Sequence, residues 1–395
     1  MSHDIFQLIS QAQQIGCNLE KANISAEGGL HIHPAYLAKI LCLTVAESVE
    51  ENQNLNNLLN DIHTETTPNE RKFLLSFFKR IWDGKDNVLE IGPFLGGSTR
   101  AIALGMMLNP NKKNLARVYT YDRFGKYHKP EELLHFLAPM FERGILGETE
   151  KQFILKNNSF LEIFDIIHRQ FEYYRMIVPQ RAILNDIPPD QDSDNEASFR
   201  FEQDQVTPFN LPEELTYSAV FVDGCKSWYG TKQFMQITLP KTSKGCYYIF
   251  QDYGTHTCFW LPVFLQVFNK YFKLVAFVDH TYTFELVEEL SQETISKNFP
   301  DSPADIPRSE YELLFKKLQA SAINFNDTYS VLNYQLQYAG LLGYLGYRDE
   351  ARSLIVKQLN SPFALTHRQW ILRALEWSTY DSQGNNIDLF LPKEI

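Results

Sequence analysis

The segment between residues 87 and 107 constrains the fold more than any other part of this chain. It contains a short β-forming run at residues 88–91, a glycine-containing turn at 92–97, and an almost continuously apolar stretch at 101–108. A strand, a tight turn and a helix opening at Ser98 or Thr99 are the structures that this order predicts. Because the apolar stretch leaves almost no polar face, we expect its helix to pack beneath a sheet.

The turn in this segment has the features of a ligand-binding loop. Glycines 92, 96 and 97 carry no Cβ, so the backbone can turn sharply and approach a ligand closely. The start of the following helix would offer unpaired N–H groups and a partial positive charge. A strand-turn-helix unit without any ligand is the alternative interpretation.

A nicotinamide dinucleotide is disfavoured at this turn. The dinucleotide fingerprint requires Gly-x-Gly-x-x-Gly, and Pro93 stands where its second glycine should be. Proline has no N–H group to offer, and its ring would crowd a pyrophosphate. An oxidoreductase is therefore the weakest of the enzyme classes that the turn suggests.

Length, charge and cysteine content narrow the class of protein. With 395 residues, the chain has room for a catalytic domain and accessory regions. Its net charge of −11 disfavours a nucleic-acid partner. No run approaches the ~20 apolar residues of a membrane span, and the N-terminus lacks the plan of a signal peptide. Five cysteines without metal-ligand spacing indicate a reducing, cytoplasmic setting.

Seven predicted strands alternate with helical segments along the middle of the chain, among them a helix at 130–146 and another at 159–174 capped by Ser159. After the strand at 88–91, further strands are expected at residues 116–122, 181–186, 217–223, 244–252, 272–278 and 282–287. The tight link at Asp279-His280 makes the last two an antiparallel hairpin. We therefore predict an α/β fold: a doubly wound, Rossmann-like sheet of seven strands with an antiparallel edge strand.

Helical regions are expected on both sides of this domain. Residues 1–84 form a predicted N-terminal cap, with helices near residues 5–12, at 34–51 and from Thr67 onward. The sheet domain spans 85–290 and contains an acidic insertion at 187–214, which is either a lid or a solvated loop. Residues 291–395 form a C-terminal helical region, with helices at 311–318, 329–345, 350–359 and 366–377. A homodimer through these helical regions is an alternative to their packing on the sheet.

The spacing Glu-x-Gly-x-x-x-Gly-Gly-Ser-Thr resembles the first motif of class I S-adenosylmethionine-dependent methyltransferases. The resemblance covers about residues 85–287 and implies the same sheet with its antiparallel edge. It places a set of turn residues around the cofactor: Glu90, Gly92, Pro93, Gly96, Gly97, Ser98 and Thr99. Asp122, at the end of the second strand, would accept both ribose hydroxyls, although a helix-capping role is also open. Asn185 and Asp186, at the end of the third strand, would contact adenine.

Two carboxylates end strands that the fold places side by side. Because neighbouring strands lie ~4.8 Å apart, the carboxylates of Asp223 and Asp252 could share one cation. With Lys226 three residues after Asp223, this pattern resembles the cation-dependent O-methyltransferases of the catechol and macrocin type. In that group the carboxylates hold Mg²⁺, which lowers the pKa of the substrate hydroxyl, and the lysine takes the proton.

The chain departs from that pattern directly after the second carboxylate. Tyr253 stands where the group has Asn or Asp, and strand alternation would point Gln251 away from the site, so metal binding is left open. His256 is a second candidate base or ligand, or a solvated loop histidine. Lys226 has a surface ion pair as its alternative. A group of aromatic residues could stack on a flat substrate or belong to the core: Trp228, Tyr229, Tyr253 and Trp260.

The sequence thus predicts a methyltransferase that moves the methyl group of S-adenosylmethionine to a hydroxyl of a small molecule such as a phenol or a sugar. Asp223, Lys226 and His256 are its candidate catalytic residues, with Mg²⁺ as a candidate second cofactor bound by Asp223 and Asp252. The alternative is a catalytically silent, cofactor-binding assembly protein of the same fold. Neither interpretation involves nucleic acid or a membrane.

Overall fold

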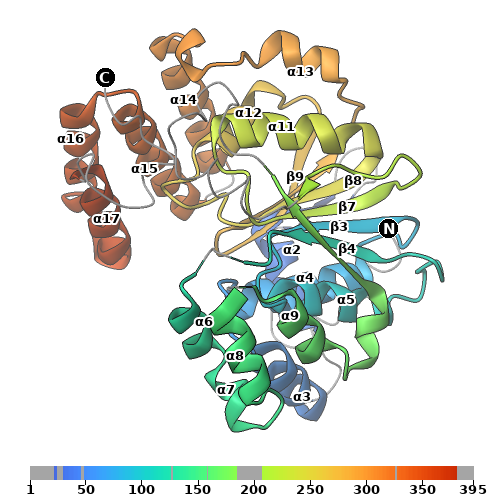
Figure 1. Ribbon diagram of the computed structural model, residues 1–395. Helices are drawn as coiled ribbons and strands as arrows, with labels where there is room; N and C mark the ends of the chain where they lie inside the picture. The colour runs from blue at the N-terminus through green and yellow to red at the C-terminus, as the bar shows by residue number, and fades with distance from the viewer. Residues whose placement is uncertain are drawn as a thin grey trace.

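One sheet with helices on both faces organises the chain (Figure 1). The computed structural model describes residues 22–24, 30–45, 49–125, 128–157, 159–184, 207–324 and 327–379. Within them the sheet has eight strands in the order β6-β5-β4-β3-β7-β8-β10-β9. Their bounds are β3 (Asn87–Ile91), β4 (Val118–Asp122), β5 (Ile177–Ile183), β6 (Thr207–Pro208), β7 (Tyr217–Val222), β8 (Thr242–Phe250), β9 (Phe272–Val278) and β10 (Thr281–Leu286).

The pairing of the strands confirms the predicted doubly wound α/β sheet. Strands β6 to β8 of the series are parallel, while β10 runs antiparallel to both β8 and β9. The antiparallel strand β10 is therefore the second strand from one edge of the sheet, and β9 is the edge strand itself. The short β6 adds a strand beside β5 to the seven that were expected. The order reverses at β3, which has β4 on one side and β7 on the other, and ligands of such sheets bind at this reversal.

The predicted strand-turn-helix unit is present and is buried. Helix α5 (Gly97–Leu108) follows the turn after β3, and its first ten residues are all buried. On the same face of the sheet lies α4 (Pro68–Arg80), which starts at the predicted place (Figure 1). There Thr67 and Glu70 form a reciprocal capping box that satisfies two backbone N–H groups. Apolar residues of α2 and α4 share one core with the sheet, so the N-terminal helices are part of the layer that covers it.

The N-terminal region differs from its prediction in two places. The expected helix at 34–51 is instead α2 (Pro34–Leu43) and a separate α3 (Val49–Asn60). Helix α2 ends because the Thr44 hydroxyl bonds to the Ile40 carbonyl at 2.8 Å, while Arg80 Nη2 donates to the Thr44 carbonyl at 2.8 Å. Upstream, β1 (Ala22–Ile24) and β2 (Leu30–Ile32) form an antiparallel pair where helix was expected. The helix predicted near residues 5–12 lies outside the described residues.

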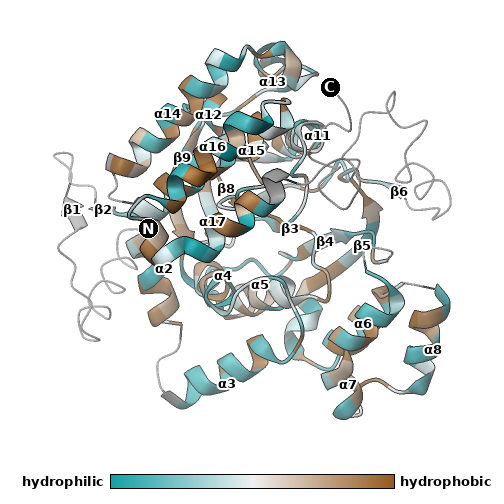
Figure 2. Ribbon diagram, turned by 90° about the vertical axis from the view of Figure 1, so that its left-hand side faces the viewer, coloured by the Kyte–Doolittle hydropathy of each residue, from teal (hydrophilic) through white to brown (hydrophobic). Residues whose placement is uncertain are grey.

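Between β4 and β5 the chain forms more, shorter helices than predicted. They are α6 (Pro130–Phe136), α7 (Ala138–Glu142) and α8 (Glu148–Asn157) (Figure 2), followed by α9 (Leu161–His168) and the 3₁₀ turn η1 (Glu172–Met176). The expected helix at 130–146 divides because Pro139 starts a new helix. Ser159 does not cap the next one, since Phe160 occupies the N-cap position without a side-chain bond. Strand β5 begins four residues before its predicted start.

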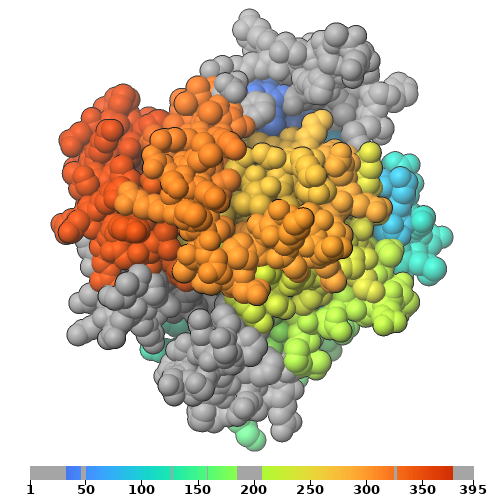
Figure 3. Space-filling model, turned by 90° about the horizontal axis from the view of Figure 1, so that it is seen from above, coloured from blue at the N-terminus to red at the C-terminus, as the bar shows by residue number. Residues whose placement is uncertain are grey.

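The opposite face and one end of the sheet carry the remaining helices. Helices α11 (Trp228–Thr238) and α12 (Trp260–Val267) cover the face opposite α4 and α5 (Figure 1). The four predicted C-terminal helices are present at one end of the molecule (Figure 3): α14 (Arg308–Asn324), α15 (Thr328–Tyr344), α16 (Arg348–Leu359) and α17 (Ala364–Thr379). A short helix that was not predicted, α13 (Gln292–Asn298), precedes them. None of the helices in the described part of the chain is both long and apolar enough to cross a bilayer.

The C-terminal helices pack on the chain's own sheet domain. Gln337 of α15 donates from Nε2 to three backbone carbonyls of the loop after β8: those of Tyr253 at 2.6 Å, Thr255 at 2.9 Å and Cys258 at 3.1 Å. A buried side chain with three such acceptors holds both segments in one arrangement. The loop that carries Asp252 is therefore fixed by α15.

Two glycines inside helices give a matched test of this packing. A Cβ on Gly105 would lie 2.4 Å from the Leu75 carbonyl oxygen of α4, whereas a Cβ on Gly343 of α15 would make an ordinary 3.9 Å contact with Ala351. We expect Gly105→Ala to lower the free energy of unfolding by about 1–3 kcal/mol. Gly343→Ala should raise it by roughly 0.5–1 kcal/mol, as measured by urea unfolding. Equal effects of the two changes would contradict the close α4–α5 contact.

Candidate functional site

The turn after β3 is pressed against the end of β7. Gly92 has a left-handed backbone with φ of 79°, and a Cβ there would lie 2.0 Å from the Asp223 carbonyl oxygen. The Asp223 N–H donates to the Ile91 carbonyl at 2.9 Å. Only glycine fits this approach. The contact joins the predicted cofactor turn to the first predicted catalytic carboxylate.

The other two glycines of the turn face the protein's own side chains. A Cβ on Gly96 would lie 2.1 Å from His168 Nε2, and one on Gly97 would lie 2.4 Å from Thr64 Oγ1. His168 is fully buried, with Nε2 2.9 Å from the Leu95 carbonyl oxygen and Nδ1 3.0 Å from the Tyr173 hydroxyl. Burial lowers the pKa of His168 to about 3, so the ring is neutral. Packing thus explains these glycines, and their contact with a cofactor stays a prediction.

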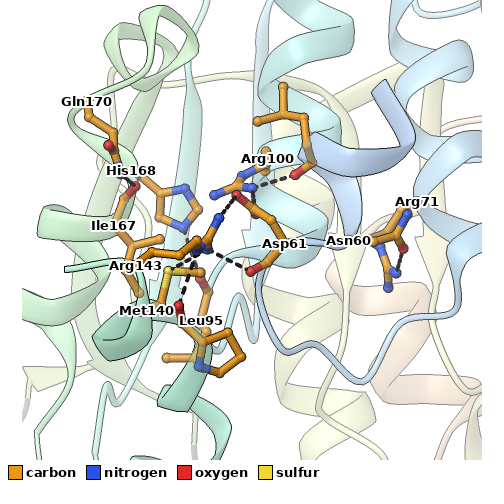
Figure 4. A network of polar contacts seen from close by, with 12 residues as sticks. Asn60, Asp61, Arg71, Leu95, Arg100, Met140, Arg143, Ile167, His168 and Gln170 are labelled. Carbon is orange, nitrogen blue, oxygen red and sulfur yellow. Dashed lines mark hydrogen bonds and ion pairs between the residues drawn. The ribbon is translucent and has the colours of Figure 1, made fainter. Parts of the chain in front are cut away.

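An ion-pair network between the buried Arg100, Asp61 and the exposed Arg143 fixes the segment that carries Thr64 (Figure 4). Arg100 of α5 is 1% exposed and binds both the Asp61 carboxylate and the Leu58 carbonyl. Arg143 reaches the same aspartate, with Nη1 3.2 Å from Asp61 Oδ2 and Nη2 3.0 Å from its carbonyl oxygen. These charge-assisted bonds join α5, the Arg143 segment and the loop before α4. They hold that loop, which carries Thr64, against Gly97 of the turn after β3.

Two acidic residues flank the turn from β3 and β4. Glu90 is fully buried and accepts a 2.7 Å hydrogen bond from Ser98 Oγ. Burial raises the pKa of Glu90 to about 7, although the Thr99, Ser98 and Thr120 hydroxyls lower it. Glu90 therefore anchors the start of α5 from inside. This burial does not support the predicted contact between Glu90 and a cofactor.

Asp122 lies at the carboxyl end of β4, beside the turn. Its Oδ1 accepts from the Phe124 N–H at 2.6 Å and its Oδ2 from the Phe94 N–H at 3.3 Å. Burial raises the pKa of Asp122 to about 6. The Arg123 backbone N–H also bonds to this carboxylate. Because a carboxylate has about four acceptor sites, these three bonds leave room for a ribose hydroxyl. Pro93 closes the turn, since its carbonyl accepts from the Gly96 N–H at 2.8 Å. Asn185 and Asp186 lie outside the described residues.

The structure brings Asp223, Lys226 and Asp252 together at the carboxyl ends of β7 and β8. Lys226 Nζ lies 3.1 Å from Asp223 Oδ1 and 2.5 Å from Asp252 Oδ2. The three side chains are 18%, 20% and 31% exposed, so a ligand can reach them. Gln251 Oε1 also lies 3.5 Å from Lys226 Nζ. The expectation that Gln251 points away is wrong because β8 ends at Phe250, before strand alternation could orient it.

The charges of this centre settle the state of the lysine. Burial lowers the pKa of Lys226, but Asp223 and Asp252 outweigh it and raise that pKa well above its ordinary value. Burial raises the pKa of Asp223 to about 6, and Lys226 opposes this shift. Lys226 is therefore an ammonium at neutral pH, and the pKa of Asp223 lies above its ordinary value because the carboxyl is buried. Glu65, a residue that the sequence did not single out, lies close enough to feel both Lys226 and Asp252.

The donor set at this centre does not fit a divalent metal. The Lys226 ammonium lies between the two carboxylates that were predicted to hold the ion. Across the described residues, no group of three or more His, Cys, Asp or Glu side chains is arranged as a metal site. Hard divalent cations need several oxygen ligands, and two carboxylates already paired with an ammonium do not supply them.

His256 and most of the nearby aromatic residues belong to the core. The His256 ring is buried edge-on against Trp370 of α17, with ring centroids 5.0 Å apart, and burial lowers its pKa to about 3. Trp228 stacks on Phe299 with centroids 3.8 Å apart, while Tyr253 and Trp260 are both 1% exposed. These positions favour the core interpretation over substrate stacking. Tyr229 is half-buried.

A cavity that the sequence did not reveal adjoins the centre. It has a volume of about 540 Å³ and is lined by Thr67, Phe277, Asp279, His280 and Tyr329. The Asp279-His280 turn lies at the carboxyl edge because β10 is antiparallel: its Tyr282 pairs with Phe250, the last residue of β8. The Gly254 N–H donates to the His280 carbonyl at 3.2 Å, which ties this turn to the Asp252 loop.

No protein-family model and no curated protein matches this chain. Among solved structures it is similar to CalS11, a TDP-rhamnose 3'-O-methyltransferase of calicheamicin biosynthesis, at 13% identity over 63% of this chain and 92% of that one, with a TM-score of 0.33. The O-methyltransferase NovP matches at 15% identity over 64% and 97% of the two chains, with a TM-score of 0.32.

A Bacillus cereus O-methyltransferase, solved with SAH, is also similar, at 12% identity over 65% of this chain and 98% of that one, with a TM-score of 0.28. All three are O-methyltransferases, the group that the sequence resembles. Because the TM-scores are below 0.5, the function proposed below depends on the strand order and residues of this chain alone.

The burial of Glu90 predicts a pH-dependent stability difference. A carboxyl whose pKa is raised on folding stabilises the protein at pH values below its pKa in the unfolded chain. This contribution is lost as the pH rises through the pKa in the folded protein, which is about 7 for Glu90. Relative to wild type, we expect the free energy of unfolding of Glu90→Gln to rise by on the order of 2 kcal/mol between pH 5 and pH 8. Urea unfolding of both proteins at the two pH values measures this difference. A constant difference would show that Glu90 is not buried as described.

Proposed function

We propose that this protein is an S-adenosylmethionine-dependent methyltransferase that methylates a hydroxyl group of a small molecule. The observation that carries this proposal is the Lys226 ammonium held between Asp223 and Asp252 beside the turn after β3. In doubly wound sheets, ligands bind at this edge. A cation and a carboxylate whose pKa is raised toward neutrality are the groups that a reacting hydroxyl needs.

The residues around the turn fit the cofactor. The start of α5 offers backbone N–H groups, and Asp122 retains acceptor capacity for a ribose hydroxyl beside its three backbone bonds. Asn185 and Asp186 are the proposed adenine contacts. When bound, S-adenosylmethionine supplies a methyl group attached to a positively charged sulfur, which an oxygen nucleophile can take.

Asp223, Lys226 and Asp252 have different roles toward the acceptor hydroxyl. Lys226 is already protonated, so it cannot take the proton as the sequence predicted; its ammonium instead stabilises the negative charge that develops on the oxygen. Asp223, with a pKa near 6, accepts the proton. Asp252 holds Lys226 in place from the other side. His256 has no part in this scheme because its neutral ring packs against α17.

We expect the reaction to be independent of divalent metal. The Lys226 ammonium supplies the positive charge that Mg²⁺ supplies in the cation-dependent group, so EDTA should leave turnover unchanged. Lys226→Met should lower kcat by roughly 10²–10³, with part of the activity retained in Lys226→Arg. The assay is transfer of labelled methyl to a panel of hydroxylated acceptors. Lys316→Met, at an exposed ion pair on α14, is the control. Loss of activity in EDTA and its return with Mg²⁺ would contradict the metal-free scheme.

Cofactor choice is tested by calorimetry. Wild-type protein should bind S-adenosylmethionine and not NAD, because Pro93 obstructs a pyrophosphate. Asp122→Ala should weaken S-adenosylmethionine binding by about tenfold or more, since it removes the acceptor of the ribose hydroxyls. Asp305→Ala, which removes an exposed carboxylate in the turn before α14, should leave affinity unchanged. Unchanged affinity in Asp122→Ala would remove the ribose assignment.

The second candidate is a methyltransferase-like protein that binds the cofactor without turnover. This candidate is favoured by the packing of His168 against Gly96 and of Thr64 against Gly97. That packing accounts for the two glycines without a bound ligand. Binding of S-adenosylmethionine with no methyl transfer to any acceptor would support it over the enzyme.

A further inference from the structure

We propose that the cavity at the Asp279-His280 turn is the acceptor site, and that it selects an acceptor carrying a protonated amine. The proposal rests on the proposed function, because it names the substrate class of the same site. It is carried by the position of the cavity, the one carboxylate in its wall and the aromatic rings around that carboxylate. Its volume of about 540 Å³ falls in the range of small-molecule sites.

The cavity belongs to the same structural unit as the Lys226 centre. The His280 carbonyl accepts from the Gly254 N–H at 3.2 Å, two residues after Asp252. The other wall contains Thr67, the N-cap residue of α4, which follows Glu65 by two positions. The charge of Lys226 acts on Glu65. A molecule in the cavity therefore borders the two segments that frame the reacting centre.

Asp279 gives the cavity its charge. Its backbone is left-handed, with φ of 48°, and its Oδ2 accepts a 2.5 Å hydrogen bond from Thr67 Oγ1. These two restraints hold the carboxylate in the wall of the cavity. No hydrogen bond to Oδ1 from a described residue accompanies them, so this oxygen can accept from a ligand.

The rest of the wall favours a cation over an anion. Neither lysine nor arginine lines the cavity among the described residues. Burial lowers the pKa of His280, so its imidazole is neutral at pH 7 even though Asp252 and Asp279 act in the opposite sense. Arg373 of α17 acts on His280 only through its electrostatic field. A carboxylate ligand would face Asp279 without a compensating partner.

Aromatic rings line the same cavity as the carboxylate. Phe277 and Tyr329 line the cavity together with His280, which stacks on Trp370 of α17 with ring centroids 4.8 Å apart. The Tyr329 hydroxyl lies 3.2 Å from His280 Nδ1, which orients both rings. Ring faces attract ammonium groups, and this attraction adds to the ion pair with Asp279. Together these groups recognise an alkylammonium on a small aromatic or aliphatic body.

Three phenols that differ mainly in charge test this selectivity. Tyramine is a cation, 4-propylphenol is neutral, and 3-(4-hydroxyphenyl)propanoate is an anion. By calorimetry on the full chain, we expect tyramine to bind about tenfold or more tightly than 4-propylphenol, and the propanoate to bind most weakly. Asp279→Asn keeps the shape of the side chain and the bond from Thr67. Its affinity for tyramine should fall to its affinity for 4-propylphenol. Asp305→Asn makes the same charge change outside the cavity and should preserve the order.

The outcomes separate this proposal from the function on which it rests. Equal affinities of wild type for the three probes, or no binding of any, overturn the proposal even if Asp279→Asn fails to fold. Tyramine affinity that survives Asp279→Asn also overturns it. S-adenosylmethionine is titrated separately into the same wild-type protein. If it does not bind while the charge order holds, the methyltransferase function fails and the cationic site stands.

Discussion

The close contact between Gly92 and the end of β7 is the constraint on which the site depends. With the Asp223 carbonyl oxygen 2.0 Å from the point where a Cβ would lie, the turn after β3 and the first residue after β7 are held against one another. The two strands are neighbours in the sheet, so the start of α5 and the Asp223 carboxylate reach the same edge. A cofactor at the turn and a reacting group at Asp223 are adjacent as a consequence.

Elements outside the sheet then restrain this edge from both sides. The Asp61, Arg100 and Arg143 network fixes the loop that carries Thr64 and Glu65 over the turn (Figure 4). Gln337 of α15 fixes the loop that carries Asp252. The helical ends of the chain therefore act as supports of the centre, and α15 also supplies one wall of the cavity.

Local signals were sufficient to predict most of the fold. The capping box at Thr67 and Glu70, the buried helix after Gly97 and the hairpin at Asp279-His280 all depend on neighbouring residues. The end of α2 at Thr44 was missed because its carbonyl is capped by Arg80, which is 36 residues away. The same limit applies to the site: Asp223, Lys226 and Asp252 could be brought together from strand order, whereas Glu65 and Gln251 could not. The cavity had a usable signal, since the turn that opens an antiparallel strand must lie at the carboxyl edge of its parallel neighbours.

The proposed function depends on binding of an adenosyl group at the turn after β3, next to Asp122. A crystal structure of the protein grown with S-adenosylhomocysteine tests it most directly. We expect electron density for the nucleoside beside Gly92, with a ribose hydroxyl bound to the Asp122 carboxylate. Density for the nucleoside elsewhere, or an unliganded turn at saturating S-adenosylhomocysteine, would contradict it.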